Sequence, residues 1–176
     1  MEHLTTYLYQ KMAYSGRYRP NIKKYKGNPD KVVYRSMWEK YAFMWCDKTP
    51  EVKSWSSEET VVPYYYDVDK RYHRYFVDLK ITFQNGKTVL VEIKPNKETS
   101  PPTGTKRTKK YISESLTYVK NMNKWEAANK YAKDRGWEFQ IWTEHTLREN
   151  GIMPKAQPGK LKSLKPLAPY RKKKKK

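Results

Sequence analysis

The stretch RYFVDLKITFQNGKTVLVEIKP, residues 74–95, predicts two strands joined by a tight turn. Apolar and polar residues alternate on both sides of Asn85-Gly86, a dipeptide that strongly favours a β-hairpin. We therefore expect strands over residues 72–83 and 87–94. The rest of the fold is interpreted around this hairpin, because its run of apolar residues is typical of strands in a protein core.

Asp78, Glu92 and Lys94 place charged side chains within the apolar pattern of the hairpin. Glu92 and Lys94 share one face of the second strand, because successive side chains of a strand point to opposite faces. If the turn closes at the Asn-Gly dipeptide, Asp78 lies opposite about position 93, one step from both. A solvated face or a weak cross-strand charge pair would account for Glu92 and Lys94 alone. Asp is depleted in strands, so Asp78 needs a further reason.

Two carboxylates and an ammonium in this arrangement have a definite chemical use. Carboxylate oxygens are hard ligands that suit Mg²⁺ or Mn²⁺, ions that usually keep water and take phosphate oxygens as further ligands. A lysine beside them can orient the attacking water or neutralise developing charge. The hairpin therefore predicts a site for metal-dependent hydrolysis of a phosphodiester, built from Asp78, Glu92 and Lys94.

The charge of the chain favours a polyanionic partner. Its 176 residues include 38 Lys and Arg against 18 Asp and Glu, which gives a formal net charge of +20. Such a field attracts nucleic acid first and an anionic membrane surface second. No apolar run approaches the roughly 20 residues that span a bilayer. No basic amphipathic helix stands out at either end, so we expect DNA as the partner and no membrane.

Other site chemistries find little support in the sequence. Cys46 is the only cysteine, which excludes an internal disulfide and a Cys-rich zinc site. The three histidines are scattered along the chain, so a His-ligated metal site is not expected. We expect no small-molecule cofactor.

The remaining periodicity predicts two helices and two more strands. Residues 34–48 carry apolar side chains at three- to four-residue spacing, and Ser36 with Glu39 is typical of an N-terminal capping box. Further elements are expected over residues 60–66 (strand), 110–134 (helix) and 137–143 (strand). The order helix, three strands, helix, strand predicts an α+β fold, with a small mixed sheet flanked by helices.

Composition divides the chain into three parts. Residues 1–31 form a basic, Tyr-rich arm broken by Gly and Pro, either a solvated surface segment or a strap on the DNA backbone. Residues 32–150 hold the predicted domain. Residues 151–176 contain ten basic residues and no acidic one, and we expect a disordered basic tail.

The candidate residues resemble a known superfamily. Asp78, a hairpin, then Glu92-Ile93-Lys94, with Glu39 on the preceding helix, resemble the PD-(D/E)xK nucleases. The resemblance implies the αβββαβ core of a restriction-endonuclease-like fold, the same order of elements as above.

A closer resemblance extends over about residues 17–145. The segments YKGNP, WSSEE, HRYFVD and VEIKP are similar to those of the head completion nucleases of large contractile-tailed bacteriophages. The TnsA-type endonucleases that cleave transposon ends share the HRYFVD-like and EIKP-like segments more loosely. Val77 stands where the superfamily motif usually has proline, a departure that the superfamily tolerates.

The resemblance implies a role for each matching residue. Asp78 and Glu92 would bind the metal ion, with the Ile93 carbonyl oxygen as a further ligand. Lys94 would be the catalytic lysine. Glu39 would reach the site from the first helix, as an additional ligand or as the carboxylate for a second metal. Its alternative role is the capping box alone.

Basic side chains of the arm and of the loop after the hairpin are candidate contacts to DNA phosphates. His73 and Arg74 lead into the Asp78 strand and are either phosphate contacts or structural residues, and Glu59 is a minor candidate for the site. The predicted DNA-binding residues are Arg17, Arg19, Lys23, Lys24, Lys26, Arg74, Lys106, Arg107, Lys109 and Lys110.

We therefore predict a Mg²⁺-dependent endodeoxyribonuclease that acts in phage head completion after DNA packaging. The resemblance implies phage head and portal-neck proteins as further partners, in the virion head and the host cytoplasm. Two alternatives stay open. One is a TnsA-like transposase or repair endonuclease, and the other is a basic head protein that binds DNA without cleaving it.

Overall fold

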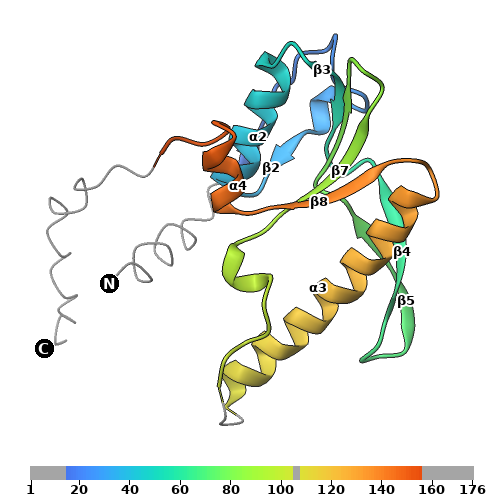
Figure 1. Cartoon of the computed structure of the whole chain (residues 1–176), viewed down its shortest axis with the longest axis vertical. Coiled ribbons are helices and arrows are strands. Elements are labelled where there is room, and N and C mark those ends of the chain that lie inside the picture. Colours follow the sequence, from blue (N-terminus) through green and yellow to red (C-terminus); the bar gives the residue numbers. More distant parts are fainter. Residues whose placement is uncertain (1–14, 105–107, 156–176) are drawn as a thin grey trace, which may run out of the picture.

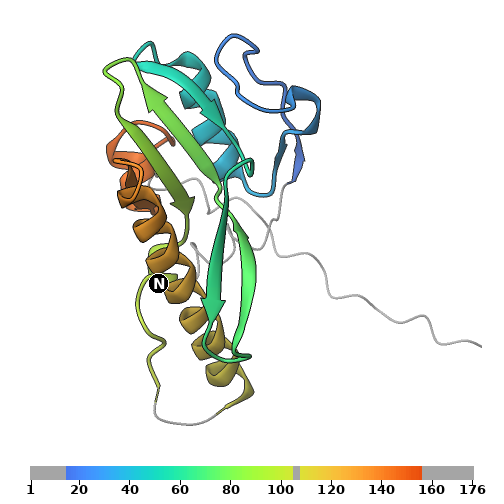
Figure 2. The ribbon, with the colours of Figure 1, turned by 90° about the vertical axis from the view of Figure 1, so that its right-hand side faces the viewer.

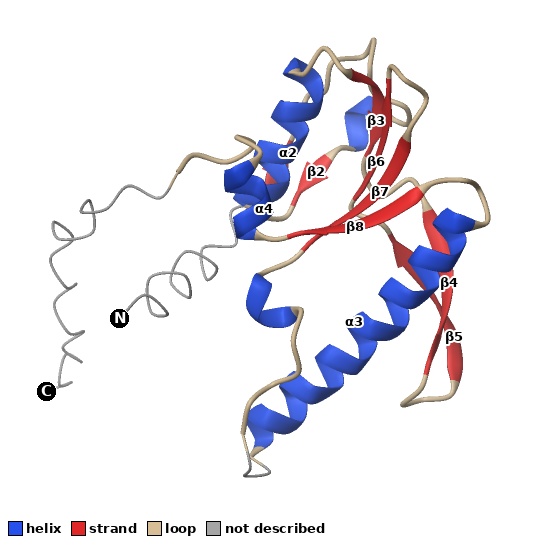
Figure 3. Ribbon diagram, viewed as in Figure 1, coloured by secondary structure: helices blue, strands red, loops and turns tan. Residues whose placement is uncertain are grey.

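A four-stranded sheet forms the centre of the protein, and helices cover both of its faces (Figure 1, Figure 3). The computed structural model describes residues 15–104 and 108–155. The order of strands is β3 (Val52–Ser56), β6 (Leu79–Phe83), β7 (Thr88–Ile93) and β8 (Glu138–Trp142). β6 runs antiparallel to both β3 and β7, whereas β8 runs parallel to β7.

Each face of the sheet has its own cluster of buried side chains. On one face, α2 (Met37–Lys48) and α4 (Glu144–Glu149) contribute residues such as Phe43 and Leu147. On the other, α3 (Lys109–Lys133) contributes small residues such as Ala128. Parallel strands need a crossover, and α3 supplies the one between β7 and β8. The predicted α+β fold, with a mixed sheet flanked by helices, is confirmed.

β7 is the central element of this arrangement, because all six of its residues are buried. Val89, Val91 and Ile93 belong to the cluster on the α2 side. Leu90 belongs to the cluster on the α3 side. Since side chains alternate along a strand, Glu92 shares the α3 side with Leu90.

A separate two-stranded hairpin lies along α3, apart from the central sheet (Figure 2). Its strands are β4 (Val61–Tyr66) and β5 (Arg71–Phe76). The remaining short elements are the pair β1 (Gly16–Arg17) and β2 (Val33–Tyr34) and the 3₁₀ helices η1 (Pro29–Lys31) and η2 (Asn96–Glu98).

The single strand predicted over residues 72–83 is wrong, because the chain breaks at Val77–Asp78 into β5 and β6. Tyr75 and Val77 pack in the cluster on the α3 side, whereas Leu79 and Ile81 pack in the cluster on the α2 side. Alternate residues of one straight strand lie on the same side of the sheet, so Tyr75 and Leu79 could not lie on opposite sides. The chain therefore changes direction at Asp78.

The hairpin after Asp78 forms with a register one residue from the predicted one. Phe83 N donates to the Lys87 carbonyl, which leaves a three-residue loop with Gly86 at φ +86°. A turn of this kind ends in a glycine in the left-handed region, whereas the prediction assumed a two-residue loop. Leu79 consequently pairs with Val91, which brings Asp78 level with Glu92 rather than with position 93.

A strand that sequence analysis missed, β3, takes the place in the sheet that was expected of residues 60–66. β3 is only five residues long and carries an irregularity between Val52 and Ser54, so its apolar alternation is broken. The helix predicted over residues 34–48 begins at Met37, and Ser36 caps it by accepting from Glu39 N at 3.2 Å. α4 was also missed.

The described part of the arm, residues 15–31, packs on the domain rather than forming a separate segment. Tyr25 is buried in the cluster on the α2 side. Lys24 Nζ donates to the carbonyls of Cys46 and Thr49 at the end of α2, at 3.3 and 2.5 Å. A cation at the carboxyl end of a helix is stabilising, which gives Lys24 a structural role.

The chain just after the domain boundary predicted at residue 150 packs on the domain. Ile152 and Met153 are buried in the cluster on the α2 side. Their backbone amides both donate to the Leu147 carbonyl, at 2.9 and 3.0 Å, so the chain is tied to α4 beyond its end. The predicted tail otherwise falls on residues 156–176, and the start of the arm on residues 1–14, outside the described residues. Within the described part of the chain, no helix has the length and apolar character needed to cross a membrane.

Asp47 joins the arm to the domain, and its removal is expected to destabilise the fold. Its carboxylate accepts from Tyr18 OH at 2.8 Å, Trp55 Nε1 at 2.8 Å and Asn21 N at 3.0 Å. We expect Asp47→Ala to lower the free energy of unfolding by about 2–4 kcal/mol, because it leaves the buried indole N–H of Trp55 without its acceptor. Urea unfolding measures the change. The control is Glu51→Ala at an exposed position, and equal stabilities of the two variants would contradict the role of Asp47.

Candidate active site

Asp78 lies at the turn between β5 and β6 and is anchored to the next strand. Its Oδ2 accepts from Ile93 N at 2.7 Å. The hydrogen bond joins the first carboxylate of the predicted site to the backbone between Glu92 and Lys94. The proximity of these residues, predicted from the hairpin, is present in the structure.

Glu92 projects from β7 on the side of α3, and its side chain is almost fully enclosed. Only 3% of the residue is exposed. Its Oε2 accepts from Tyr75 OH at 2.5 Å, and its Oε1 lies 3.4 Å from Lys94 Nζ. A buried carboxylate needs such partners, because an unpaired one costs several kcal/mol.

Lys94 keeps its positive charge at this position. Burial acts to lower the pKa of its ammonium, but the carboxylates of Glu92 and Asp78 outweigh that effect and raise it above its ordinary value. Its side chain is 28% exposed, so the ammonium is close to the buried Glu92 and also accessible from solvent.

Asp78 has an unfavourable electrostatic environment. Loss of solvent raises the pKa of its carboxyl well above the ordinary value, and the nearby charges of Glu92 and Glu39 raise it further. The amide of Ile93 and the ammonium of Lys94 act in the opposite direction but do not compensate. A further positive charge close to Asp78 would therefore be stabilising.

Glu39 contributes charge to the site but is held by the start of α2. Its Oε1 accepts from Ser36 Oγ at 3.0 Å and its Oε2 from Arg35 N at 2.7 Å. Burial raises the pKa of Glu39, against the effect of these two hydrogen bonds. The capping role considered for Glu39 is thus present, and its side chain acts on Asp78 through space.

The donors present fit a hard divalent cation. Among the described residues, no group of three or more His, Cys, Asp and Glu side chains gathers closely enough to hold a metal ion by itself. Two carboxylates beside a backbone segment form an incomplete set of oxygen ligands. Such a set suits Mg²⁺ or Mn²⁺, which take water and substrate phosphate oxygens to complete their coordination. The uncompensated charge around Asp78 favours the same kind of ion.

Two side chains of the site were missed by sequence analysis, Tyr75 and Lys124. In the strand predicted over residues 72–83, Tyr75 follows the apolar alternation like an ordinary core side chain, although a buried Tyr hydroxyl usually needs a partner. Lys124 extends from α3, and its Nζ lies 5.2 Å from the centre of the Tyr75 ring. The pKa of Lys124 lies below its ordinary value, because burial and the charge of Lys94 lower it more than the charge of Glu92 raises it. No spacing rule in the sequence linked a residue on this helix to the hairpin.

The predicted DNA-binding residues are divided between several surfaces. Lys24 is engaged at the end of α2, and Arg74 lies over the Phe76 ring on the hairpin β4–β5, 5.0 Å from its centre. Lys106 and Arg107 lie outside the described residues. The exposed ones are Arg17, Arg19, Lys23, Lys26, Arg74, Lys109 and Lys110.

The other two minor candidates have partners away from Asp78. Glu59 accepts from Asn28 N at 3.2 Å, and His73 Nε2 lies 2.8 Å from Asp69 Oδ2. Neither contact involves Asp78, Glu92 or Lys94.

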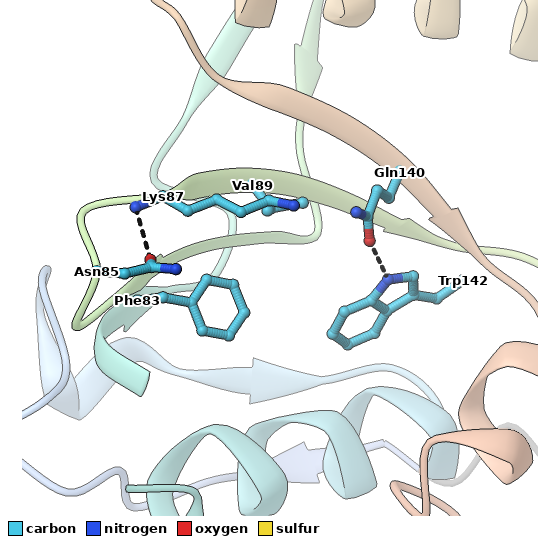
Figure 4. Close-up of a pocket in the computed structure, with 6 residues that line it drawn as sticks. All are labelled: Phe83, Asn85, Lys87, Val89, Gln140 and Trp142. Atoms are coloured by element: carbon cyan, nitrogen blue, oxygen red, sulfur yellow. Dashed lines mark hydrogen bonds between the residues drawn. The ribbon is translucent and has the colours of Figure 1, made fainter. Parts of the chain in front are cut away.

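A pocket near the turn of the β6–β7 hairpin is separate from these carboxylates (Figure 4). Val89 and Trp142 belong to the cluster on the α2 side, whereas Glu92 faces α3. The pocket is therefore on the opposite side of the sheet. Its lining residues are Phe83, Asn85, Lys87, Val89, Gln140 and Trp142.

Comparison with known proteins places the chain among nucleases. Residues 49–144 match the family described as the TnsA-like endonuclease N-terminal domain. The Head completion nuclease of Enterobacteria phage T4 is 44% identical over 147 residues, which cover 80% of this chain and 98% of that protein. No solved structure matches the chain. The matched family segment contains Asp78, Glu92 and Lys94, whereas Glu39 precedes it.

The charge repulsion around Asp78 predicts that its neutralisation stabilises the metal-free protein. Asp78→Asn keeps an oxygen acceptor for Ile93 N and removes a carboxylate whose pKa is raised by burial and by Glu92. We expect a gain of about 1 kcal/mol in the free energy of unfolding at neutral pH. A raised pKa means that the native state takes up a proton more readily, so the gain should shrink as the pH falls through that pKa.

Thermal unfolding in EDTA at several pH values measures this difference. Glu51→Gln, at an exposed position, is the matched control and should leave the unfolding temperature unchanged. A lower unfolding temperature for Asp78→Asn at neutral pH would show that the carboxylate stabilises the fold.

Proposed function

This chain belongs to the family of head completion nucleases and carries its TnsA-like endonuclease domain, and from that premise we propose that Asp78, Glu92 and Lys94 hydrolyse DNA phosphodiesters with a divalent metal ion. The protein is a DNA endonuclease of phage head completion. The observation that supports the site assignment is the convergence of these three residues: Asp78 bonds the backbone of Ile93, and Glu92 in the buried strand β7 lies 3.4 Å from Lys94 just after it.

The metal ion is proposed to be Mg²⁺ or Mn²⁺. Asp78 and Glu92 would hold it, with the Ile93 carbonyl oxygen as a further ligand and Glu39, whose charge acts on Asp78, as an additional carboxylate. When bound, such an ion lowers the pKa of a coordinated water and stabilises negative charge on a phosphate. The carboxylates supply the charge that attracts the ion, and the hydrogen bond from Ile93 N fixes the direction of Asp78.

Lys94 acts as a cation in this proposal. Because Glu92 and Asp78 raise its pKa, Lys94 is an ammonium at neutral pH and has no free lone pair with which to accept a proton. Its role is to donate to the attacking water or to a phosphate oxygen and to stabilise the charge that develops there.

Tyr75 positions the second carboxylate. Its hydroxyl donates to Glu92 Oε2, which leaves Oε1 next to Lys94. A hydrogen bond of this kind fixes the rotamer of a ligating side chain before a metal or substrate arrives. Lys124, close to the Tyr75 ring, adds positive charge on the α3 side of the site.

The setting of the reaction follows from the family. DNA is the substrate, and phage head completion places the reaction in an infected cell or a virion. We propose further that the protein acts at the head, next to portal and neck proteins, after DNA packaging.

Cleavage by variants tests the assignment of the site. We expect Lys94→Ala to lose at least about a hundredfold in cleavage rate while still binding Mn²⁺, because it removes only the stabilising cation. Asp78→Ala and Glu92→Ala should lose both cleavage and metal binding. Rates on linear DNA are compared with Mg²⁺, with Mn²⁺ and with EDTA, and metal binding is measured by calorimetry. Equal cleavage by wild type and Lys94→Ala would remove Lys94 from the mechanism.

If wild type and variants bind DNA equally and none of them cleaves it, the site assignment fails. The alternative of a DNA-binding head protein would then account for the site.

Tyr75→Phe tests the positioning role separately from the chemistry. The substitution keeps the ring in the core and removes the hydroxyl that orients Glu92. We expect the affinity for Mn²⁺, measured by calorimetry, to fall by roughly 10–100-fold. Tyr64→Phe removes a hydroxyl from another buried ring on the same side of the hairpin and is the matched control. Equal metal affinity of both variants would show that Glu92 does not depend on Tyr75.

A further inference from the structure

The outer face of the β4–β5 hairpin carries exposed aromatic side chains. Exposed residues alternate with buried or half-buried ones along β4 and, in β5, from Tyr72 to Phe76, so one face of the hairpin packs toward α3 and the other is turned to solvent (Figure 2). Tyr72 is 76% exposed, and Tyr65 and Phe76 are each 41% exposed. Exposed apolar side chains that gather on one face mark a candidate interaction surface.

The rings are ordered across the two strands by cross-strand pairs. Tyr65 pairs with Tyr72, and their ring centres are 5.3 Å apart. Val61 pairs with Phe76 at the other end of the hairpin. Between them, Arg74 pairs with Pro63 and extends its guanidinium over the Phe76 ring, 5.0 Å from its centre. The face is therefore a row of flat groups with a cation in the middle.

The strand that carries this row continues into the candidate active site. Tyr72, Arg74 and Phe76 are alternate residues of β5, so they are spaced at roughly 7 Å along one face. Phe76 is followed by Val77 and then by Asp78. The row thus begins two residues from the first carboxylate and extends outward over roughly 14 Å.

The composition of the face selects among possible partners. The outward positions of the two strands include one arginine and no acidic residue, in a chain with a formal net charge of +20. Exposed aromatic rings interleaved with a basic side chain are typical of surfaces that bind single-stranded nucleic acid, where unpaired bases stack on the rings. Paired bases in a duplex have their faces covered by their neighbours and cannot stack in this way.

We propose that the outer face of the β4–β5 hairpin binds unpaired bases of a DNA strand that runs from the active site, through Tyr72, Arg74 and Phe76. The substrate class is DNA with a single-stranded segment next to the cleaved phosphate, such as a frayed end or a branch. The part of the inference that concerns cleavage rests on the proposed function, whereas the binding of unpaired bases does not.

Binding is tested in the Asp78→Asn background with EDTA, where the DNA stays intact. The probes are a labelled oligothymidine and a labelled duplex of the same length, and the measurement is fluorescence anisotropy at fixed salt. We expect Tyr72→Leu to weaken binding of oligothymidine roughly tenfold and to change binding of the duplex much less, because leucine keeps apolar area but cannot stack. Tyr72→Phe should retain the binding of oligothymidine. Val68→Ala, at an exposed apolar position in the turn of the same hairpin, is the control.

Two results would overturn the proposal. Equal loss on oligothymidine and duplex would mean that Tyr72→Leu acts on general DNA binding and not on unpaired bases. Unchanged affinity for both would assign the aromatic face to a protein partner instead.

Cleavage adds a test of the substrate class. Wild type should cut a branched DNA faster than a duplex, and Tyr72→Leu should bring the ratio of the two rates close to one. A ratio unchanged by Tyr72→Leu would contradict the substrate class. If wild type cuts neither substrate, the proposed function fails, while the binding measurements still decide whether the hairpin holds unpaired bases.

Discussion

Glu92 occupies a strand in which every residue is buried. The structure around it depends on supplying that one carboxylate with hydrogen-bond and charge partners. A carboxylate in this position is tolerated only with donors close to it. Tyr75 reaches it from β5, and Lys94 lies two residues further along the same chain. Tyr75 can do so because the β4–β5 hairpin lies against α3, on the side of β7 to which Glu92 points. The separate hairpin, which is peripheral to the sheet, is thereby part of the site.

The change of direction at Val77–Asp78 connects the two halves of the fold. It allows Tyr75 to pack on the α3 side and Leu79 on the α2 side, and it leaves Asp78 between them with its carboxylate on Ile93 N. Val77 itself stays paired, since its N donates to the Thr60 carbonyl and its carbonyl accepts from Glu58 N. The backbone on both sides of Asp78 is therefore fixed, which holds the carboxylate in place without a partner on its own strand.

The sequence was sufficient for the elements that carry strong local signals and insufficient for those set by distant contacts. The helix with Ser36 and Glu39 and the long helix before the last strand were predicted close to their observed bounds. The β6–β7 hairpin was predicted around Asn85-Gly86, with a first strand that was too long. The register was missed by one residue, because Asn-Gly is compatible with both two- and three-residue loops. β3 was missed because the segment is short and irregular, and it forms a strand only through its pairing with β6. Tyr75 and Lys124 joined the site through packing of the hairpin on α3, which periodicity alone does not specify.

A comparison of Asp47 with Asp78 shows why the latter is the stronger candidate for a functional group. Both carboxylates are partly buried, but Asp47 accepts three hydrogen bonds, from Tyr18, Trp55 and Asn21, and so has most of its capacity filled. Asp78 accepts one, from a backbone amide. It also lies in the field of two other carboxylates, with a single lysine opposing them.

A chain with 38 Lys and Arg could readily place a second cation next to Asp78. Among the described residues, Lys124 has its Nζ 5.2 Å from the centre of the Tyr75 ring, and its ammonium is itself partly desolvated. The excess of negative charge around Asp78 is thus local to the site, and it does not follow from the composition of the protein, which is basic. A ligand that brings positive charge would remove it, and a metal ion held by Asp78 and Glu92 has the charge and the ligand preference to do so.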